Sequence, residues 1–145
     1  MVHRHFEQTE EVVNNLTEMH SKLDVLEEML ADERDNIPGP AQNLLPMHYQ
    51  LTMLETFRNQ TMHEAKKASS ASRTTLIKWF ERLNKFVEEF DEYLFTLARN
   101  ILPIVRAGYP QAIVKLVKIA EMEGKEDEKV RAKQPIHEPI LHSIR

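Results

Sequence analysis

Apolar residues in the second half of the chain recur at alternating spacings of four and three residues. This heptad spacing places them on one stripe of an α-helix, and such a stripe needs a covering helix from this chain or another. The stripe, called here the long seam, comprises Leu76, Phe80, Leu83, Val87, Phe90, Leu94, Leu97 and Ile101. The pattern therefore predicts a protein whose function depends on packing helices.

A second stripe with the same spacing lies near the start of the chain. This first seam comprises Val12, Leu16, Met19, Leu23, Leu26 and Leu30. Burying one Leu or Phe side chain contributes about 1.5–3 kcal/mol, so either seam offers strong association. We expect partner helices to contact Leu16, Leu23, Leu26 and Leu30 of the first seam, together with the long seam from Leu76 to Leu97.

Proline and glycine divide the chain into segments. Because two prolines around a glycine cannot continue a helix, the run Ile37-Pro38-Gly39-Pro40 predicts a loop, with Asn43 as the N-cap of the next helix. We expect an elongated all-α fold with helical-bundle or coiled-coil packing. Its predicted parts are a helix over 1–36, a loop over 37–43, a long helix over 44–107, a third helix over 108–133 and an irregular tail over 134–145.

The small-residue stretch 65–72 leaves two alternatives open. It is either a close helix–helix approach within one continuous helix, or a break after which Ser72 caps a new helix. Continuity is favoured because no Gly or Pro interrupts the stretch.

Further along, Pro103 should kink or end the long helix. Gly108 suits a left-handed turn position and Pro110 suits the first turn of the third helix. On that helix we expect Ile113, Val117 and Ala120 to face the same way.

The composition excludes several classes of function. The chain of 145 residues has a net charge of −4, which argues against a binder that neutralises nucleic-acid phosphates. It has no Cys, so thiolate catalysis, cysteine metal sites and disulfides are excluded. Because no apolar signal-peptide core or membrane-length apolar run is visible, we expect a soluble, intracellular protein without a membrane span.

Acidic and histidine residues do not form a recognisable catalytic or metal motif. The cluster Glu88, Glu89, Asp91 and Glu92 lies off the long seam, and the Glu-x-x-His pairs of di-iron bundles are missing. His63-Glu64 is not continued into a zinc-protease pattern. We therefore predict no catalytic residue, no cofactor and no metal, and interpret the acidic cluster as a solvated face.

Basic and aromatic residues near the long seam allow two interpretations each. The tract of Lys66, Lys67, Arg73, Lys78, Arg82 and Lys85 could meet acidic lipids or an acidic partner, although a solvated or helix-pairing role is favoured. Trp79 and Phe86 flank the seam. They are expected to widen the buried face, with a partner-binding anchor as the alternative.

Residues 90–108, 118–130 and 6–16 resemble the fungal Sec-six subunit of the exocyst, exocyst complex component three. The resemblance covers about residues 2–132 and is expected to stop at Lys133, with the tail arising from a premature end or altered splicing. It implies an N-terminal portion of a non-enzymatic helical subunit that helps to tether secretory vesicles at the plasma membrane. The implied partners are other exocyst subunits, above all Sec-eight, and fusion proteins of the SNARE class.

Two other classes of function stay open at this point. One is a stand-alone coiled-coil scaffold without an exocyst role, and the other is a metal-dependent helical-bundle enzyme.

Overall fold

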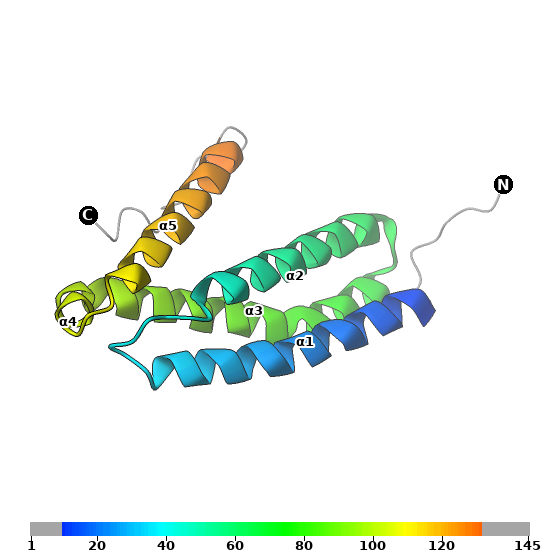
Figure 1. Ribbon diagram of the computed structural model, residues 1–145. Coiled ribbons are helices and arrows are strands. Elements are labelled where there is room, and N and C mark those ends of the chain that lie inside the picture. Colours follow the sequence, from blue (N-terminus) through cyan, green and yellow to red (C-terminus); the bar gives the residue numbers. More distant parts are fainter. Residues whose placement is uncertain (1–9, 132–145) are drawn as a thin grey trace. The chain divides into compact units, whose positions relative to one another are not determined.

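The computed structural model describes residues 10–131 (Figure 1). Its elements are α1 (Glu10–Arg34), α2 (Leu44–Glu64), the short 3₁₀ helix η1 (Ala65–Lys67), α3 (Ser70–Arg99), α4 (Ile101–Arg106) and α5 (Pro110–Arg131). No strand occurs within residues 10–131, so the all-α prediction is confirmed. The predictions for residues 1–9 and for the tail over 134–145 lie outside the described residues.

The chain divides into two compact units, and α1, α2 and α3 each contribute to both. Among the described residues, the first unit contains 10–28 and Tyr49–Glu89, and the second contains Met29–His48 and 90–131.

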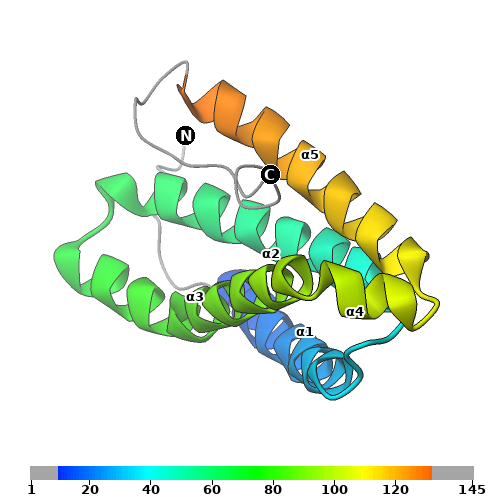
Figure 2. The ribbon, with the colours of Figure 1, turned by 90° about the vertical axis from the view of Figure 1, so that its left-hand side faces the viewer.

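In the first unit, α1 and α3 run in the same direction and α2 runs opposite to them (Figure 1, Figure 2). Phe57 of α2 meets Phe80 of α3 edge-on, with ring centroids 5.9 Å apart. The core is built from leucine, methionine and phenylalanine side chains of all three helices. Its members include Leu16, Met19, Leu23 and Leu26 of α1, Leu51 and Leu54 of α2, and Leu76, Phe80, Leu83 and Phe86 of α3.

The second unit places the α1–α2 loop beside α5. Lys115 of α5 donates hydrogen bonds from Nζ to the backbone oxygens of Pro40 and Ala41, at 3.1 and 3.3 Å. The second unit also has an apolar core. It comprises Leu30, Ala41, Leu44, Met47, Phe90, Tyr93, Leu94, Leu97, Ile104, Ala112, Leu116, Ile119 and Ala120.

The continuous helix expected over 44–107 is wrong, because the chain breaks between α2 and α3. Ala68 is extended, with φ −81° and ψ 169°. Ser69 then caps α3 by accepting the Ser72 backbone N–H at its Oγ, 3.2 Å away. Arg73 holds the turn by donating from Nη1 to the backbone oxygens of Lys66 and Ala68. The alternative with a break is correct, although Ser69 and not Ser72 is the capping residue.

A second break separates α3 from α4. α3 ends at Arg99, ahead of Pro103, since a proline ring clashes with the carbonyl four residues before it. The Asn100 side chain donates from Nδ2 to the backbone oxygen of Thr96, at 2.6 Å. Pro103 thus lies in the first turn of α4. The helix that was expected to run to 107 ends at Arg99 instead.

The turn between α4 and α5 matches the prediction. Gly108 has a φ of 95°, the left-handed region, and α5 begins at Pro110. The Tyr109 N–H donates to the oxygen of Ile104 and the Gly108 N–H to that of Val105, at 3.1 and 3.0 Å. These two bonds form a Schellman motif, which satisfies the last carbonyls of α4.

The expected face of α5 is right at Ala120 and wrong at Ile113 and Val117. The buried residues are Ala112, Leu116, Ile119 and Ala120. Ile113 and Val117 are instead partly exposed.

Candidate assembly surface

Most residues of both predicted seams are buried within this chain. Ten of the eleven residues proposed as partner contacts are at most 2% exposed, and Val87 is partly exposed. The ten are Leu16, Leu23, Leu26, Leu30, Leu76, Phe80, Leu83, Phe90, Leu94 and Leu97. The helices of the chain itself therefore cover these side chains, and their contact with a partner helix stays a prediction.

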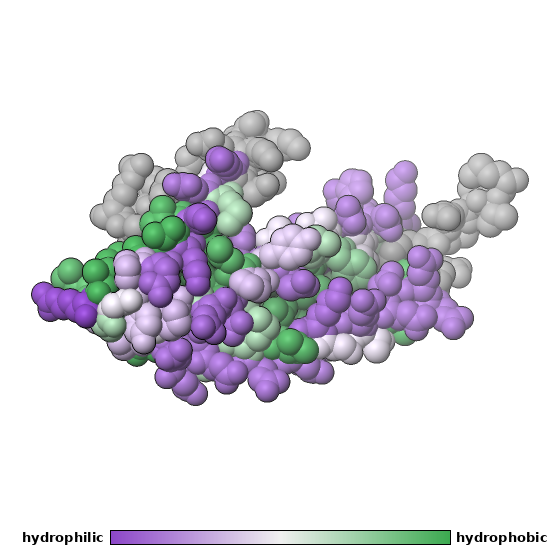
Figure 3. Space-filling view, viewed as in Figure 1, coloured by the Kyte–Doolittle hydropathy of each residue, from purple (hydrophilic) through white to green (hydrophobic). Residues whose placement is uncertain are grey.

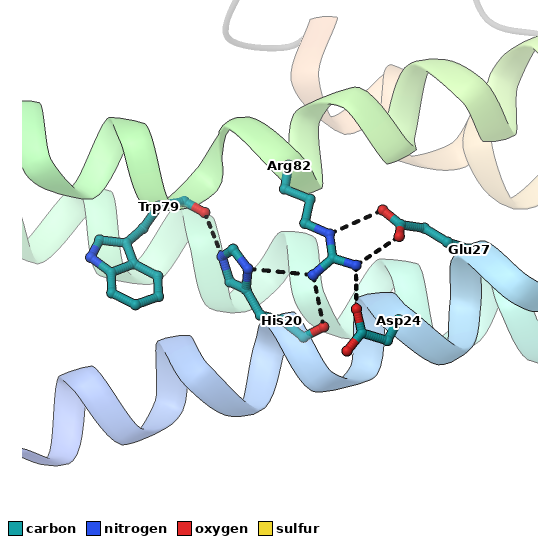
Figure 4. A network of polar contacts seen from close by, with 5 residues as sticks. All are labelled: His20, Asp24, Glu27, Trp79 and Arg82. Atoms are coloured by element: carbon teal, nitrogen blue, oxygen red, sulfur yellow. Dashed lines mark hydrogen bonds and ion pairs between the residues drawn. The ribbon is translucent and has the colours of Figure 1, made fainter.

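A polar network centred on Arg82 of α3 joins this helix to α1 (Figure 4). Arg82 donates from Nη2 and Nε to the two carboxylate oxygens of Glu27, at 2.7 and 3.1 Å. It also donates from Nη2 to Asp24 and from Nη1 to the backbone oxygen of His20. The hydrogen bonds that Arg82 donates to Glu27, and then those to Asp24, raise the pKa of Arg82 above its usual range. The network fixes the pairing of the two helices by charge-assisted bonds.

His20 links this network to Trp79. Its Nε2 lies 3.2 Å from the backbone oxygen of Trp79, and because that oxygen only accepts, Nε2 carries the proton. The imidazole meets the indole edge-on, with centroids 5.2 Å apart. Trp79 remains partly exposed, whereas Phe86 is 1% exposed. The prediction of a widened core is confirmed for Phe86, and Trp79 lies at the surface.

Two groups in the second unit, the buried Tyr93 and the partly exposed His48, have shifted pKa values. Burial, and to a lesser degree the charge of Glu33, raises the pKa of Tyr93. Burial lowers the pKa of His48, whose ring centroid lies 6.3 Å from that of Phe90. Both shifts follow mainly from burial.

Within the part of the chain that the structure describes, no three His, Asp or Glu side chains are placed to hold a metal ion. Across the same residues, no helix combines the length and apolar character needed to cross a membrane.

Large apolar side chains lie at the surface of the second unit. Leu102 and Val105 of α4 are 65% and 44% exposed, and Val114 of α5 is 55% exposed. Ile113 and Val117 of α5 are partly exposed. We call these five residues the apolar patch, and Figure 3 shows green side chains gathered over α4 and the start of α5. Patches of this kind mark interaction sites more often than isolated exposed residues do.

The apolar patch follows from a double apolar face on α5. One face, with Ala112, Leu116 and Ile119, is buried against the rest of the unit. The other carries Ile113, Val114 and Val117. A helix that is apolar on more than one face is typical of one with more than one neighbour. The consecutive apolar residues of α5, such as Ile113 and Val114, indicate a second apolar face in the sequence. The prediction for α5 described one face only.

Comparison with known proteins identifies the relatives of the chain. Residues 80–143 match the family model for exocyst complex component Sec6. The chain is 30% identical over 125 residues to exocyst complex component sec6 of Schizosaccharomyces pombe and 27% identical over 126 residues to SEC6 of Saccharomyces cerevisiae. The chain is similar to the Sec6 component of the exocyst. Each Sec6 alignment covers 86% of this chain and 16% of the relative, and no solved structure matches.

The Sec6 match corrects one expectation from the sequence. The family model extends to residue 143, so the expectation that the resemblance stops at Lys133 is wrong. The suggestion of altered splicing rested on the resemblance ending at Lys133, so this match removes its support.

Proposed function

We propose that this chain is a helical assembly segment of a Sec6-type exocyst subunit. The observation that carries the proposal is the similarity to two fungal Sec6 proteins over 86% of the chain. Since the chain spans 16% of the length of those relatives, the role of a whole subunit is part of the proposal. The segment acts by binding sibling subunits, without catalysis, in the cytoplasm at plasma-membrane sites of vesicle docking.

The apolar patch is the proposed contact with a sibling subunit, for which Sec-eight is the first candidate. Three of its five side chains are exposed, whereas most side chains of the two seams are covered by the chain itself. We assign the seams to building the bundle that presents the patch. Contacts with SNARE-class fusion proteins remain a prediction from the family resemblance.

Co-expression with a tagged Sec-eight subunit tests the proposal. The chain should co-purify with it, and Leu102→Glu and Val114→Glu should each weaken capture, because a charge in an apolar contact loses hydration without gaining a partner. Lys125→Glu is the matched control, since Lys125 is exposed three turns further along the outward side of α5.

Two outcomes count against different parts of the proposal. A folded chain that captures no exocyst subunit contradicts the assembly role. Equal capture by the control and both patch variants retains that role and removes the apolar patch as the contact.

A further inference from the structure

The turn between α2 and α3 lies at the surface and has no role in the proposed assembly. We call its residues 66–72, with the sequence Lys-Lys-Ala-Ser-Ser-Ala-Ser, the serine turn. None of its side chains is buried, whereas Ala65 directly before it is fully buried. Figure 1 shows the serine turn where the chain reverses between the two helices. Its side chains are therefore open to an enzyme that modifies them.

Ser69 differs from the other hydroxyl residues of the chain in the basic residues before it. Lys66 and Lys67 precede it by three and two positions. Ser70 and Thr61 also have a basic residue three positions earlier, but neither has a second one two positions earlier. Basophilic protein kinases select such pairs, because carboxylates in their substrate cleft attract positive charges at fixed positions before the reacting hydroxyl.

The serine turn can enter a kinase cleft with little loss of native structure. A kinase binds its substrate as an extended segment, and Ala68 is already extended, with φ −81° and ψ 169°. Ser69 Oγ accepts the Ser72 N–H at 3.2 Å and donates to Ser72 Oγ at 3.0 Å. Opening these surface bonds uncovers no apolar core, so it costs far less than global unfolding. Thr61, in contrast, is 7% exposed within α2.

We propose that Ser69 is a phosphorylation site for a basophilic serine/threonine kinase that recognises Lys66 and Lys67. In the transfer, Ser69 Oγ forms a bond to the γ-phosphorus of ATP, while the bond from that phosphorus to the β–γ bridging oxygen breaks. ADP leaves with the bonding electrons, and the hydroxyl proton passes to the catalytic carboxylate of the kinase. The product carries a charge of about −1.5 to −2 at Ser69.

A phosphate on Ser69 stabilises the start of α3. Ser69 caps this helix, and the first N–H groups of a helix favour a nearby negative charge. The Ser72 N–H keeps an acceptor, because phosphorylation retains Oγ and adds three acceptor oxygens. Arg73 Nη1 already binds the backbone oxygen of Ala68, directly before Ser69, at 2.9 Å, so a cation lies close to the new charge. The modification therefore tightens the turn between α2 and α3.

Phosphorylation of the folded, full chain tests the proposal. The chain is incubated with MgATP and the catalytic subunit of cyclic-AMP-dependent protein kinase, a basophilic enzyme, and the sites are located by fragmentation mass spectrometry. Phosphate should enter at Ser69. Ser69→Ala should lower the initial rate at least about tenfold, whereas Ser69→Thr, which keeps both the hydroxyl and the helix cap, should retain incorporation at position 69.

Lysine variants test how the kinase selects Ser69. Lys66→Gln and Lys67→Gln should each lower kcat/KM for phosphorylation about threefold to thirtyfold. Lys78→Gln is the matched control and should change it little, because Lys78 is an exposed lysine nine residues beyond Ser69. Thr61 reports on folding, since its hydroxyl becomes accessible only when α2 unfolds.

The stability of the product supplies a second readout. The phosphorylated chain should unfold about 1–4 °C above the unmodified chain, because the phosphate favours the start of α3. A lower unfolding midpoint would refute the stabilising effect.

Three results of the kinase experiment overturn the phosphorylation site. The first is equal incorporation into the parent chain and Ser69→Ala, and the second is equal loss of kcat/KM for Lys66→Gln and Lys78→Gln. The third is phosphate on Thr61 as well as on Ser69, which assigns the reaction to unfolded chains.

Discussion

The carboxylate of Glu33, near the end of α1, accepts the backbone N–H of Asn43, just before α2, at 3.0 Å. Glu33 is 4% exposed and so carries its charge into the interior of the second unit. A buried carboxylate is stable only where hydrogen bonds replace its hydration. This one closes the loop between the two helices, because it satisfies a donor at the start of α2.

Glu33→Ala should lower the free energy of unfolding by about 1–3 kcal/mol, since it leaves the Asn43 N–H without its partner. The exposed neighbour Asp32 provides the control, and Asp32→Ala should change stability by less than about 0.5 kcal/mol. Urea unfolding followed by circular dichroism measures both. Equal effects of the two variants would contradict the role of Glu33.

The burial of the long seam predicts a graded response to truncation. Leu83 is fully buried and Val87 is partly exposed. Leu83→Ala should therefore cost about 2–5 kcal/mol of stability, with a clearly smaller loss for Val87→Ala. Thermal unfolding of the isolated chain checks this order. If Leu83→Ala left the isolated chain intact and only weakened partner capture, the seam would be an intermolecular contact after all.

The Arg82 network predicts that Lys cannot replace Arg. Lys cannot reproduce the paired bonds from Nη2 and Nε to Glu27, so Arg82→Lys should cost about 0.5–1.5 kcal/mol, and less at high salt. Lys85→Ala on the same helix is the control. A double-mutant cycle with Glu27→Gln measures the coupling, and a coupling energy of zero would reduce the network to a surface contact without energetic effect.

The lowered pKa of His48 predicts a loss of stability in acid. Below its ordinary pKa of about 6.5, the unfolded chain binds a proton at His48 that the folded chain binds less readily, so stability falls as pH decreases through this range. His48→Gln should flatten that part of the curve. Unfolding of both chains between about pH 5 and pH 8 isolates the effect, and parallel curves would assign the acid sensitivity to other groups.

The sequence predicted those features that depend on local spacing. The heptad positions from Leu76 to Leu97 mark the buried stripe of α3 because the spacing of a helix decides which side chains share a face. Gly108 and Pro110 marked their turn, since each restricts the backbone in a known way.

Other features depended on contacts that spacing does not encode. The break at 65–69 has neither Gly nor Pro, and it is stabilised by Ser69 and by the reach of Arg73 back to the turn. Arg82 meets Asp24 and Glu27 because α1 and α3 pack side by side, a tertiary contact between residues more than 50 positions apart in the sequence. The apolar patch could not be told from the core of α5, because apolar residues occupy both faces.

The turn at Gly108 has a consequence for how this molecule could change over time. The direction in which α5 leaves α4 is set by two backbone hydrogen bonds and a left-handed glycine. Because backbone atoms fix that direction, the outward side chains of α5 can diversify while the helix keeps its path. Substitutions at Ile113, Val114 and Val117 could thus change which partner is bound during evolution while the fold is kept.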